Sequence, residues 1–263
     1  MPFSNKIVWI TGASSGIGEA LAKGLSRKGA TLILSARRVD RLERVLRHCE
    51  GDDHMVLPLD VTHSDSHQAA FDAILDRFGR LDILILNAGI GQRGSIRESG
   101  LEIERRVMEV NFFGCTSLTH VTLPHFLERG SGHYVVMSSV MGKIATPRRA
   151  TYSASKHALH GYYEGLRAEL HETDIAITLL CPGYVKTEIS RHSLIPSGVE
   201  HGKMDAQHIE AMTAAVFAKK ALRVIARKKA ITFIGGAERF GPLIERIFPG
   251  LYRFLIPRVM NRE

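Results

Sequence analysis

The 263-residue sequence contains only three cysteines, Cys49, Cys115 and Cys181, and none belongs to a Cys-x-x-Cys pair. An odd number of isolated cysteines does not make a disulfide framework, so we expect reduced thiols in a reducing compartment. The sequence also lacks a run of about 18 uncharged apolar residues, the length that a transmembrane helix needs. No apolar signal region precedes the run KIVWI near the amino terminus, so we expect no cleaved signal peptide and a cytoplasmic location.

Excess positive charge is missing from most of the chain. The formal net charge is +8, but residues 219–263 alone contain 11 Lys or Arg and three acidic residues, so the rest is neutral overall. This distribution argues against a general nucleic-acid-binding surface and indicates a specialised basic carboxyl-terminal end. A hydrophobic content of 44% with 24% charged residues is typical of a soluble globular protein.

Short apolar runs rich in β-branched residues, among them TLILS and DILIL, alternate with helical patterns along the chain. Continuous apolar strands separated by helices predict an α/β fold: a single-domain, doubly wound parallel sheet of about seven strands, Rossmann-like, with helices on both faces. The predicted helices cover residues 16–28, 39–49, 64–78, 101–129, 151–171 and 205–227. We predict one dinucleotide-binding and catalytic domain over residues 1–240 and a basic amphipathic extension over residues 241–263.

A glycine-rich turn, ITGASSGIG, follows the first predicted strand and opens the first predicted helix. Gly12 would allow the tight turn, Gly16 a close backbone approach to a pyrophosphate, and Gly18 the packing of the helix on the sheet. The amide groups at the helix start would bind phosphate oxygens. The alternative is a glycine-rich turn without a ligand.

The second strand ends in the sequence SARR. A carboxylate at this position binds the ribose 2′-hydroxyl of NAD, but the position holds Ala36 and is followed by Arg37 and Arg38. Guanidinium groups bind a 2′-phosphate, which a carboxylate would repel, so the sequence predicts NADP(H). The alternative is a pair of solvated arginines, which the positive end of the helix dipole disfavours.

Tyr152 and Lys156 are four residues apart and therefore lie on one face of a helix. A free tyrosine has a pKa of about 10, and a nearby ammonium lowers it, which makes the pair a candidate for proton transfer. The alternative is an ordinary helix surface, because this spacing is common. Tyr162 and Tyr163 have no lysine four residues later, and we predict that they are packing residues.

These motifs together resemble the short-chain dehydrogenase/reductase family, in its single-domain Y-x-x-x-K branch. The residues that carry the resemblance are T-G-A-S-S-G-I-G after the first strand, N-A-G after the fourth, Ser139 thirteen residues before Tyr152, Y-S-A-S-K, and P-G after the sixth strand. The similarity covers roughly residues 6–236. The ARR strand end and the tail also give a loose similarity to steroid- and lipid-directed NADP(H) reductases of the family.

The resemblance implies a catalytic set of Asn111, Ser139, Tyr152 and Lys156. Tyr152 would exchange a proton with the substrate oxygen, to which Ser139 would also donate, while Ser138 would face away. Lys156 would hold the nicotinamide ribose and lower the tyrosine pKa, and Asn111 would hold a water leading to solvent. Without the family, Asn111 could simply distort a helix and Ser139 could cap a strand end.

The resemblance also implies a cofactor shell, in which Thr11 and Asn87 form a structural polar pair. The residues expected to bind NADP(H) are Gly12, Ser14, Ser15, Gly16, Ile17, Gly18, Arg37, Arg38, Asp60, Val61, Asn87, Ala88, Gly89, Tyr152, Lys156, Pro182, Gly183, Val185 and Thr187.

Two segments remain without an assigned role. The loop over residues 188–204, a mobile lid in the family, mixes apolar residues with charges and favours an apolar or amphiphilic substrate. Its His192 and His201 lack the spacing of metal ligands, and we expect no metal. The tail has apolar residues at helical spacing, interleaved arginines, and breaks at Pro249 and Pro257. It is either packed against its own or a partner subunit, or lies on an anionic membrane surface.

The sequence therefore predicts an NADP(H)-dependent oxidoreductase acting on a carbonyl or secondary alcohol, expected to be a homodimer or homotetramer. The alternatives are a catalytically silent NADP-binding sensor or scaffold, and a membrane-surface-associated module. The substrate itself is not determined by these motifs.

Overall fold

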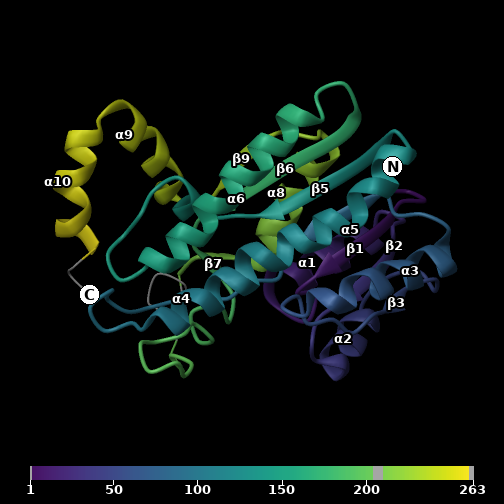
Figure 1. Ribbon diagram of the computed structural model, residues 1–263, viewed down its shortest axis with the longest axis horizontal. Coiled ribbons are helices and arrows are strands. Elements are labelled where there is room, and N and C mark those ends of the chain that lie inside the picture. The colour runs from purple at the N-terminus through teal and green to yellow at the C-terminus, as the bar shows by residue number, and fades with distance from the viewer. Residues whose placement is uncertain (1, 204–209, 261–263) are drawn as a thin grey trace.

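The structure, a computed structural model, describes residues 2–203 and 210–260. Seven parallel strands form one sheet with helices on both faces, which confirms the predicted fold class (Figure 1). The sheet order is β3-β2-β1-β4-β5-β6-β9. The strands are β1 (Ile7–Thr11), β2 (Thr31–Ser35), β3 (Met55–Val56), β4 (Ile83–Leu86), β5 (Ser131–Met137), β6 (Asp174–Pro182) and β9 (Ile231–Ile234). The chain reverses its direction of travel across the sheet between β1 and β4, where such folds bind ligands.

Alternate side chains of the strands point to opposite faces of the sheet and pack in two separate hydrophobic cores. Val8 and Ile10 of β1 pack with one set of helices, and Ile7 and Trp9 pack with the other set. Because every residue of β1 is buried, the strand is apolar from Ile7 to Ile10 rather than alternating. The major helices are α1 (Gly16–Ser26), α2 (Val39–Leu46), α3 (His67–Phe78), α4 (Leu101–Met108), α5 (Gly114–Glu128), α6 (Ala150–Glu169) and α8 (Ala214–Ala226).

Two predicted helices differ from those observed. The helix expected over residues 101–129 contains one π-helical turn, η2 (Glu109–Phe113), between α4 and α5. The helix expected from residue 205 begins at Ala214 instead, because β8 (Met212–Thr213) pairs with β7 (Val185–Lys186). The Thr213 hydroxyl accepts a hydrogen bond from the Val216 amide at 3.3 Å and caps the helix. Residues 205–209 of the prediction lie outside the described residues.

The tail forms two helices, α9 (Gly241–Ile247) and α10 (Pro249–Met260), at one end of the molecule and apart from the helices that cover the sheet (Figure 1, yellow). Pro249 begins α10 as predicted. The break predicted at Pro257 is wrong, because the helix continues through that residue to Met260. No helix within the described ranges is long and apolar enough to cross a membrane.

Candidate active site

The glycine-rich turn leaves no space for side chains at its glycines. Gly12 has a positive φ of 64°, and a Cβ atom there would lie 2.8 Å from the Ala88 Cα atom. A Cβ atom on Gly18 would lie 2.3 Å from the Gly12 carbonyl oxygen. The turn therefore presents backbone atoms without side chains at the start of α1. Ser15 precedes that helix without a side-chain capping bond, so a bound anion could take hydrogen bonds from the first amides.

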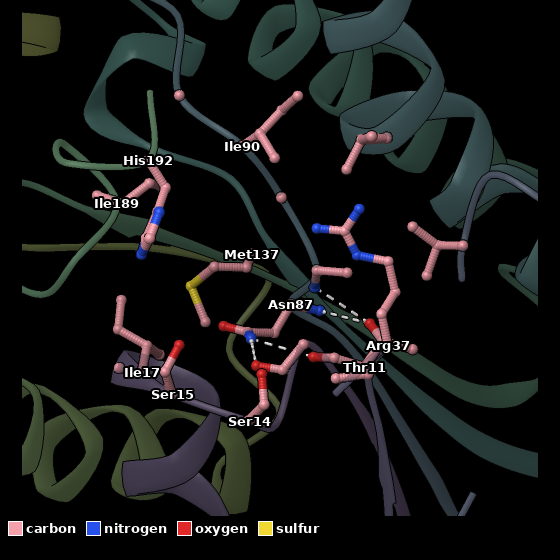
Figure 2. Close-up of a pocket in the computed structure, with 18 of the residues that line it drawn as sticks. Thr11, Ser14, Ser15, Ile17, Arg37, Asn87, Ile90, Met137, Ile189 and His192 are labelled. Atoms are coloured by element: carbon pink, nitrogen blue, oxygen red, sulfur yellow. Dashed lines mark hydrogen bonds between the residues drawn. The ribbon is translucent and has the colours of Figure 1, made fainter. Parts of the chain in front are cut away.

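Asn87 fixes the end of β4 against this turn, as the predicted polar pair requires. Its amide nitrogen Nδ2 donates to the carbonyl oxygens of Thr11 and Gly12, at 3.1 and 3.0 Å. The Thr11 hydroxyl in turn accepts hydrogen bonds from the backbone amides of Asn87 and Ala88, both at 3.1 Å. Figure 2 shows these bonds beneath the cavity that the turn borders. The two strand ends are thus held at a fixed separation.

A cavity of about 810 Å³ runs from the second strand end, past the glycine-rich turn, to α6. Arg37 and Arg38 line one end of it, and the Arg37 side chain is 71% exposed, with Asp60 at 4.0 Å. In Figure 2, Arg37 lies on the side of the cavity opposite to Ile189 and His192. Two guanidinium groups without an acid at position 36 make this end of the cavity attractive to a phosphate.

A second cavity of about 570 Å³ adjoins the first. Both are lined by Gly91, Tyr152, Pro182 and Ile189, so these residues mark the place where the cavities meet. Ser139 lines the second cavity, and its hydroxyl caps the turn that follows β5 by accepting from the Met141 amide at 3.1 Å. The arrangement places the Tyr152 phenol between a dinucleotide-sized cavity and a separate, mainly apolar one, with the Ser139 hydroxyl on the side of the second cavity.

The Tyr152 side chain is partly buried where the two cavities meet. Burial raises the pKa of its phenol, while a hydrogen bond with the Ser139 side chain and the charge of Arg149 oppose that rise. The sequence predicts that Lys156 lowers this pKa, but in this structure burial is the larger effect and Lys156 does not offset it. The Lys156 side chain is directed elsewhere. Its ammonium donates to the Met137 carbonyl oxygen at 2.9 Å and lies 5.8 Å from the centre of the tyrosine ring. Burial lowers the pKa of Lys156 itself to about 8.

Asn111 lies in the π-helical turn and is fully buried. Its side chain accepts a hydrogen bond from the Ile90 amide at 2.8 Å and donates to the Ile90 carbonyl oxygen and the Ser155 hydroxyl, both at 3.0 Å. Through these bonds the side chain holds the segment that follows β4. Asn111 thus joins the helix of Tyr152 and Lys156 to the cofactor edge of the sheet.

Most predicted cofactor residues line the first cavity. They are Gly12, Ser14, Ser15, Gly16, Ile17, Arg37, Arg38, Asp60, Val61, Asn87, Ala88, Gly89, Tyr152, Lys156, Pro182 and Thr187. Three do not: Gly18 lies beneath the turn, Gly183 lines the second cavity, and Val185 is buried in the hydrophobic core. The resemblance predicts that Val185 binds the cofactor, but in β7 its side chain packs in the hydrophobic core. The Ser138 hydroxyl donates to the Lys156 carbonyl oxygen at 3.4 Å rather than lining the second cavity.

Several residues that line the two cavities are not among the predicted site residues. His192 and Glu188 border the first cavity, and the His192 ring nitrogen Nδ1 lies 2.7 Å from a Glu200 carboxylate oxygen. Tyr252 and Ile256 of the tail line the second cavity. Only their place on α10 brings these tail residues to the site, and no local sequence motif identifies them. Tyr163, by contrast, is buried as predicted, 2.7 Å from the Thr119 hydroxyl.

Comparison with known sequences identifies one family. The sequence profile described as short chain dehydrogenase matches residues 6–195. The chain is similar to a protein named dehydrogenase/reductase SDR family member 7 from Homo sapiens, with 46% identity over 73% of this chain and 58% of that protein. It therefore spans less than two thirds of that relative. A Drosophila melanogaster protein named dehydrogenase/reductase SDR family protein 7-like is 37% identical over 96% of this chain and 80% of its own length.

Solved structures with the same fold include relatives that hold nicotinamide cofactors. A short-chain dehydrogenase from Streptomyces avermitilis superimposes with a TM-score of 0.82 at 26% identity, over 98% of both chains. A Burkholderia phymatum short chain dehydrogenase/reductase in complex with NAD gives 0.80 at 26% identity, over 96% of this chain and 93% of that one. An alcohol dehydrogenase from Thermococcus sibiricus with 5-hydroxy-NADP gives 0.76 at 28% identity, over 89% and 98%.

Proposed function

The chain belongs to the short-chain dehydrogenase family, and from this premise we propose that it is an NADP(H)-dependent oxidoreductase. It interconverts a carbonyl compound and a secondary alcohol, acting in the reductive direction. The observation that carries the proposal is the position of Tyr152, where the two cavities meet. A phenol at that junction can exchange a proton with a substrate in the second cavity while a cofactor occupies the first.

The residues of the first cavity fit a dinucleotide. The turn offers backbone without Cβ atoms, the start of α1 offers amides without a side-chain cap, and Arg37 and Arg38 offer positive charge. A Cβ atom on Gly16 would lie 3.1 Å from the Thr187 methyl carbon across the cavity, so a substituent there would narrow it. When bound, the nicotinamide supplies or accepts the hydride.

The protein's own residues position the substrate and manage the proton. Tyr152 donates its phenol proton to the carbonyl oxygen during reduction, and Ser139 donates a hydrogen bond to the same oxygen. Lys156 would hold the ribose hydroxyls of the cofactor, for which its ammonium has to leave the Met137 carbonyl oxygen. Moving that charge toward Tyr152 would lower the phenol pKa from the raised value that burial gives it.

Replacing Tyr152 by phenylalanine tests the chemistry. We expect the variant to bind NADPH normally and to lose about 10²- to 10⁴-fold in kcat, because only the proton donor is removed. The measurement is NADPH oxidation across a panel of aldehydes and ketones, with Tyr162→Phe as the matched control on the same helix. Unchanged turnover in Tyr152→Phe would refute the proposed role, and no turnover of any carbonyl by the unaltered enzyme would favour a nucleotide-binding sensor.

Replacing Arg37 by alanine tests the choice of cofactor. Loss of a charge-assisted contact to the 2′-phosphate is expected to weaken NADPH binding by about 10- to 100-fold and to leave NADH binding nearly unchanged. Arg44→Ala, on the exposed side of α2, is the control, because Arg44 does not line the cavity. Tighter binding of NADH than of NADPH by the unaltered protein would contradict the preference.

The family resemblance also supports assembly into a homodimer or homotetramer. Phe113, directly before α5, and Leu127, near its end, leave apolar surface on this part of the molecule, and they are 49% and 47% exposed. Light scattering of the purified protein measures the mass directly, and a monomeric mass would contradict this part of the proposal.

A further inference from the structure

The inner face of the tail helices α9 and α10 borders the second cavity. Ile244 of α9 and Tyr252 and Ile256 of α10 line the second cavity. The Tyr252 hydroxyl donates to the Ala145 carbonyl oxygen at 2.9 Å, which ties α10 to the loop after β5. The inner face therefore forms a wall of the site.

The opposite face of the same helices is also apolar, but nothing in the described chain covers it. Its side chains are between 50% and 59% exposed, and none lines either cavity. We define this outer tail face as Leu243, Ile247, Phe248, Leu251 and Phe254. A helix that is apolar on both sides has a partner on both sides, since an exposed cluster of this kind marks an interaction surface.

Positive charge borders the outer tail face. From residue 239 to residue 258 the chain has four arginines and one acid, Glu245. The Arg258 guanidinium lies 3.7 Å from the centre of the Phe254 ring, and that of Arg239 lies 4.8 Å from the centre of the Phe240 ring. Arginines stacked on aromatic rings at the edge of an apolar face suit the border between lipid chains and anionic headgroups.

We propose that the outer tail face binds an anionic lipid surface. The helices, of 7 and 12 residues, are too short to span a bilayer and so would lie in its interface. A symmetric contact with a second copy of the chain would bring the two sets of arginines together, and their repulsion disfavours that occupant. Negatively charged headgroups supply the complementary charge.

This surface bears on the substrate as well. Ile244 and Leu255 line the second cavity and belong to the helices that would rest on the lipid, so the cavity lies directly behind that surface. An apolar carbonyl compound dissolved in the bilayer could enter without crossing water. This substrate class rests on the proposed function, whereas lipid binding does not.

Vesicle flotation of the full chain, without cofactor or substrate, tests the lipid contact. The unaltered protein should float with vesicles of phosphatidylcholine and phosphatidylserine, and much less with phosphatidylcholine alone. The double variant Leu251→Ser/Phe254→Ser should lose at least tenfold in the vesicle-bound to free ratio. The control Val39→Ser/Val216→Ser, which changes exposed apolar residues on α2 and α8, should bind like the unaltered protein.

The charge contribution is tested separately by Arg246→Gln/Arg253→Gln, which leaves the apolar face intact. It should abolish the preference for phosphatidylserine, whereas Arg223→Gln/Arg227→Gln at the end of α8 should keep it. Failure of the unaltered protein to float, or equal loss in tail and control variants, overturns the proposal. A fall in oligomer mass of Leu251→Ser/Phe254→Ser with unchanged flotation also overturns it and assigns the face to a second copy. All these results leave the nucleotide chemistry untouched, because neither cofactor nor turnover is measured.

Discussion

Lys156 illustrates how a residue proposed to act in catalysis can destabilise the fold. Its side chain is buried, and the Met137 carbonyl oxygen accepts a hydrogen bond from its ammonium. Burial lowers its pKa to about 8, well below the value of about 10.4 for a lysine in an unfolded chain. The folded protein therefore disfavours the charged form, and a cofactor hydroxyl that accepts from the ammonium would relieve this penalty.

This penalty predicts a specific pH dependence of stability. Below about pH 8 Lys156 is charged in both the folded and the unfolded protein, so the folded state is destabilised by the full cost of burying that charge. This cost falls as the pH rises toward about 10, because the buried lysine loses its proton. The unfolding free energy of the unaltered protein should therefore rise relative to Lys156→Met by on the order of 2–3 kcal/mol between pH 7 and pH 10.

Urea titrations at several pH values measure how the difference in unfolding free energy between the two proteins changes with pH. The hydrogen bond that methionine cannot make adds a constant to that difference and does not affect the change. Lys219→Met on the exposed side of α8 is the control and should show no such change. The prediction is contradicted if the unfolding free energies of Lys156→Met and the unaltered protein differ by the same amount at every pH, because a buried charged lysine requires that this difference change.

At the scale of elements, the turn between β1 and α1 depends on the close approach of three chain segments. A Cβ atom on Gly18 would lie 2.3 Å from the Gly12 carbonyl oxygen and 2.7 Å from the Asn87 amide nitrogen Nδ2. These atoms belong to the backbone of the turn and to the side chain that fixes β4. Neither can move without displacing the turn that we propose binds the phosphates.

Gly18→Ala is therefore expected to destabilise the protein by about 1–3 kcal/mol and to weaken NADPH binding, because the turn must shift. Gly165→Ala is the matched change on α6, where an added Cβ atom meets nothing within 4 Å. That control should gain about 0.5–1 kcal/mol, because alanine is the better helix former. Urea unfolding and nucleotide titration measure both effects, and equal stability of the two variants would contradict the tight packing of the turn.

At the scale of the whole molecule, the first cavity links separate parts of the fold. The first cavity is bordered by the glycine-rich turn, the ends of β2 and β4, and α6, so a ligand there contacts both halves of the sheet. A ligand that binds only the folded state stabilises the molecule as a unit. The second cavity adds the tail, which makes α9 and α10 part of the site rather than an appendage.

NADPH at about 100 times its dissociation constant should stabilise the fold by about 2.7 kcal/mol. For a chain of this size that corresponds to a rise in Tm of about 5–10 °C. The same concentration of NADH should give a smaller rise, and Arg37→Ala should reduce the NADPH effect toward the NADH value. Thermal unfolding with each nucleotide measures the shifts, and equal shifts in the unaltered protein would contradict the predicted preference.

Local patterns in the sequence determined the order and type of most elements. Strands such as β1 are buried on both sides and are therefore continuously apolar, which is visible without a structure. The spacing of Tyr152 and Lys156 places them on one helical face whatever surrounds that helix. The glycines of the turn likewise reflect a local backbone requirement, because Gly12 and Gly16 both have positive φ.

Only the tertiary structure decided how these groups behave. The direction of the Tyr152 pKa depends on burial and on where the Lys156 ammonium points, and both are set by distant segments. The same holds for Val185 in the core, for Asn111 bound to Ile90, and for the tail helices that wall the second cavity. Periodicity specifies which face of a segment is apolar, but it does not specify what that face meets, because contacts between distant segments arise only when the whole chain packs.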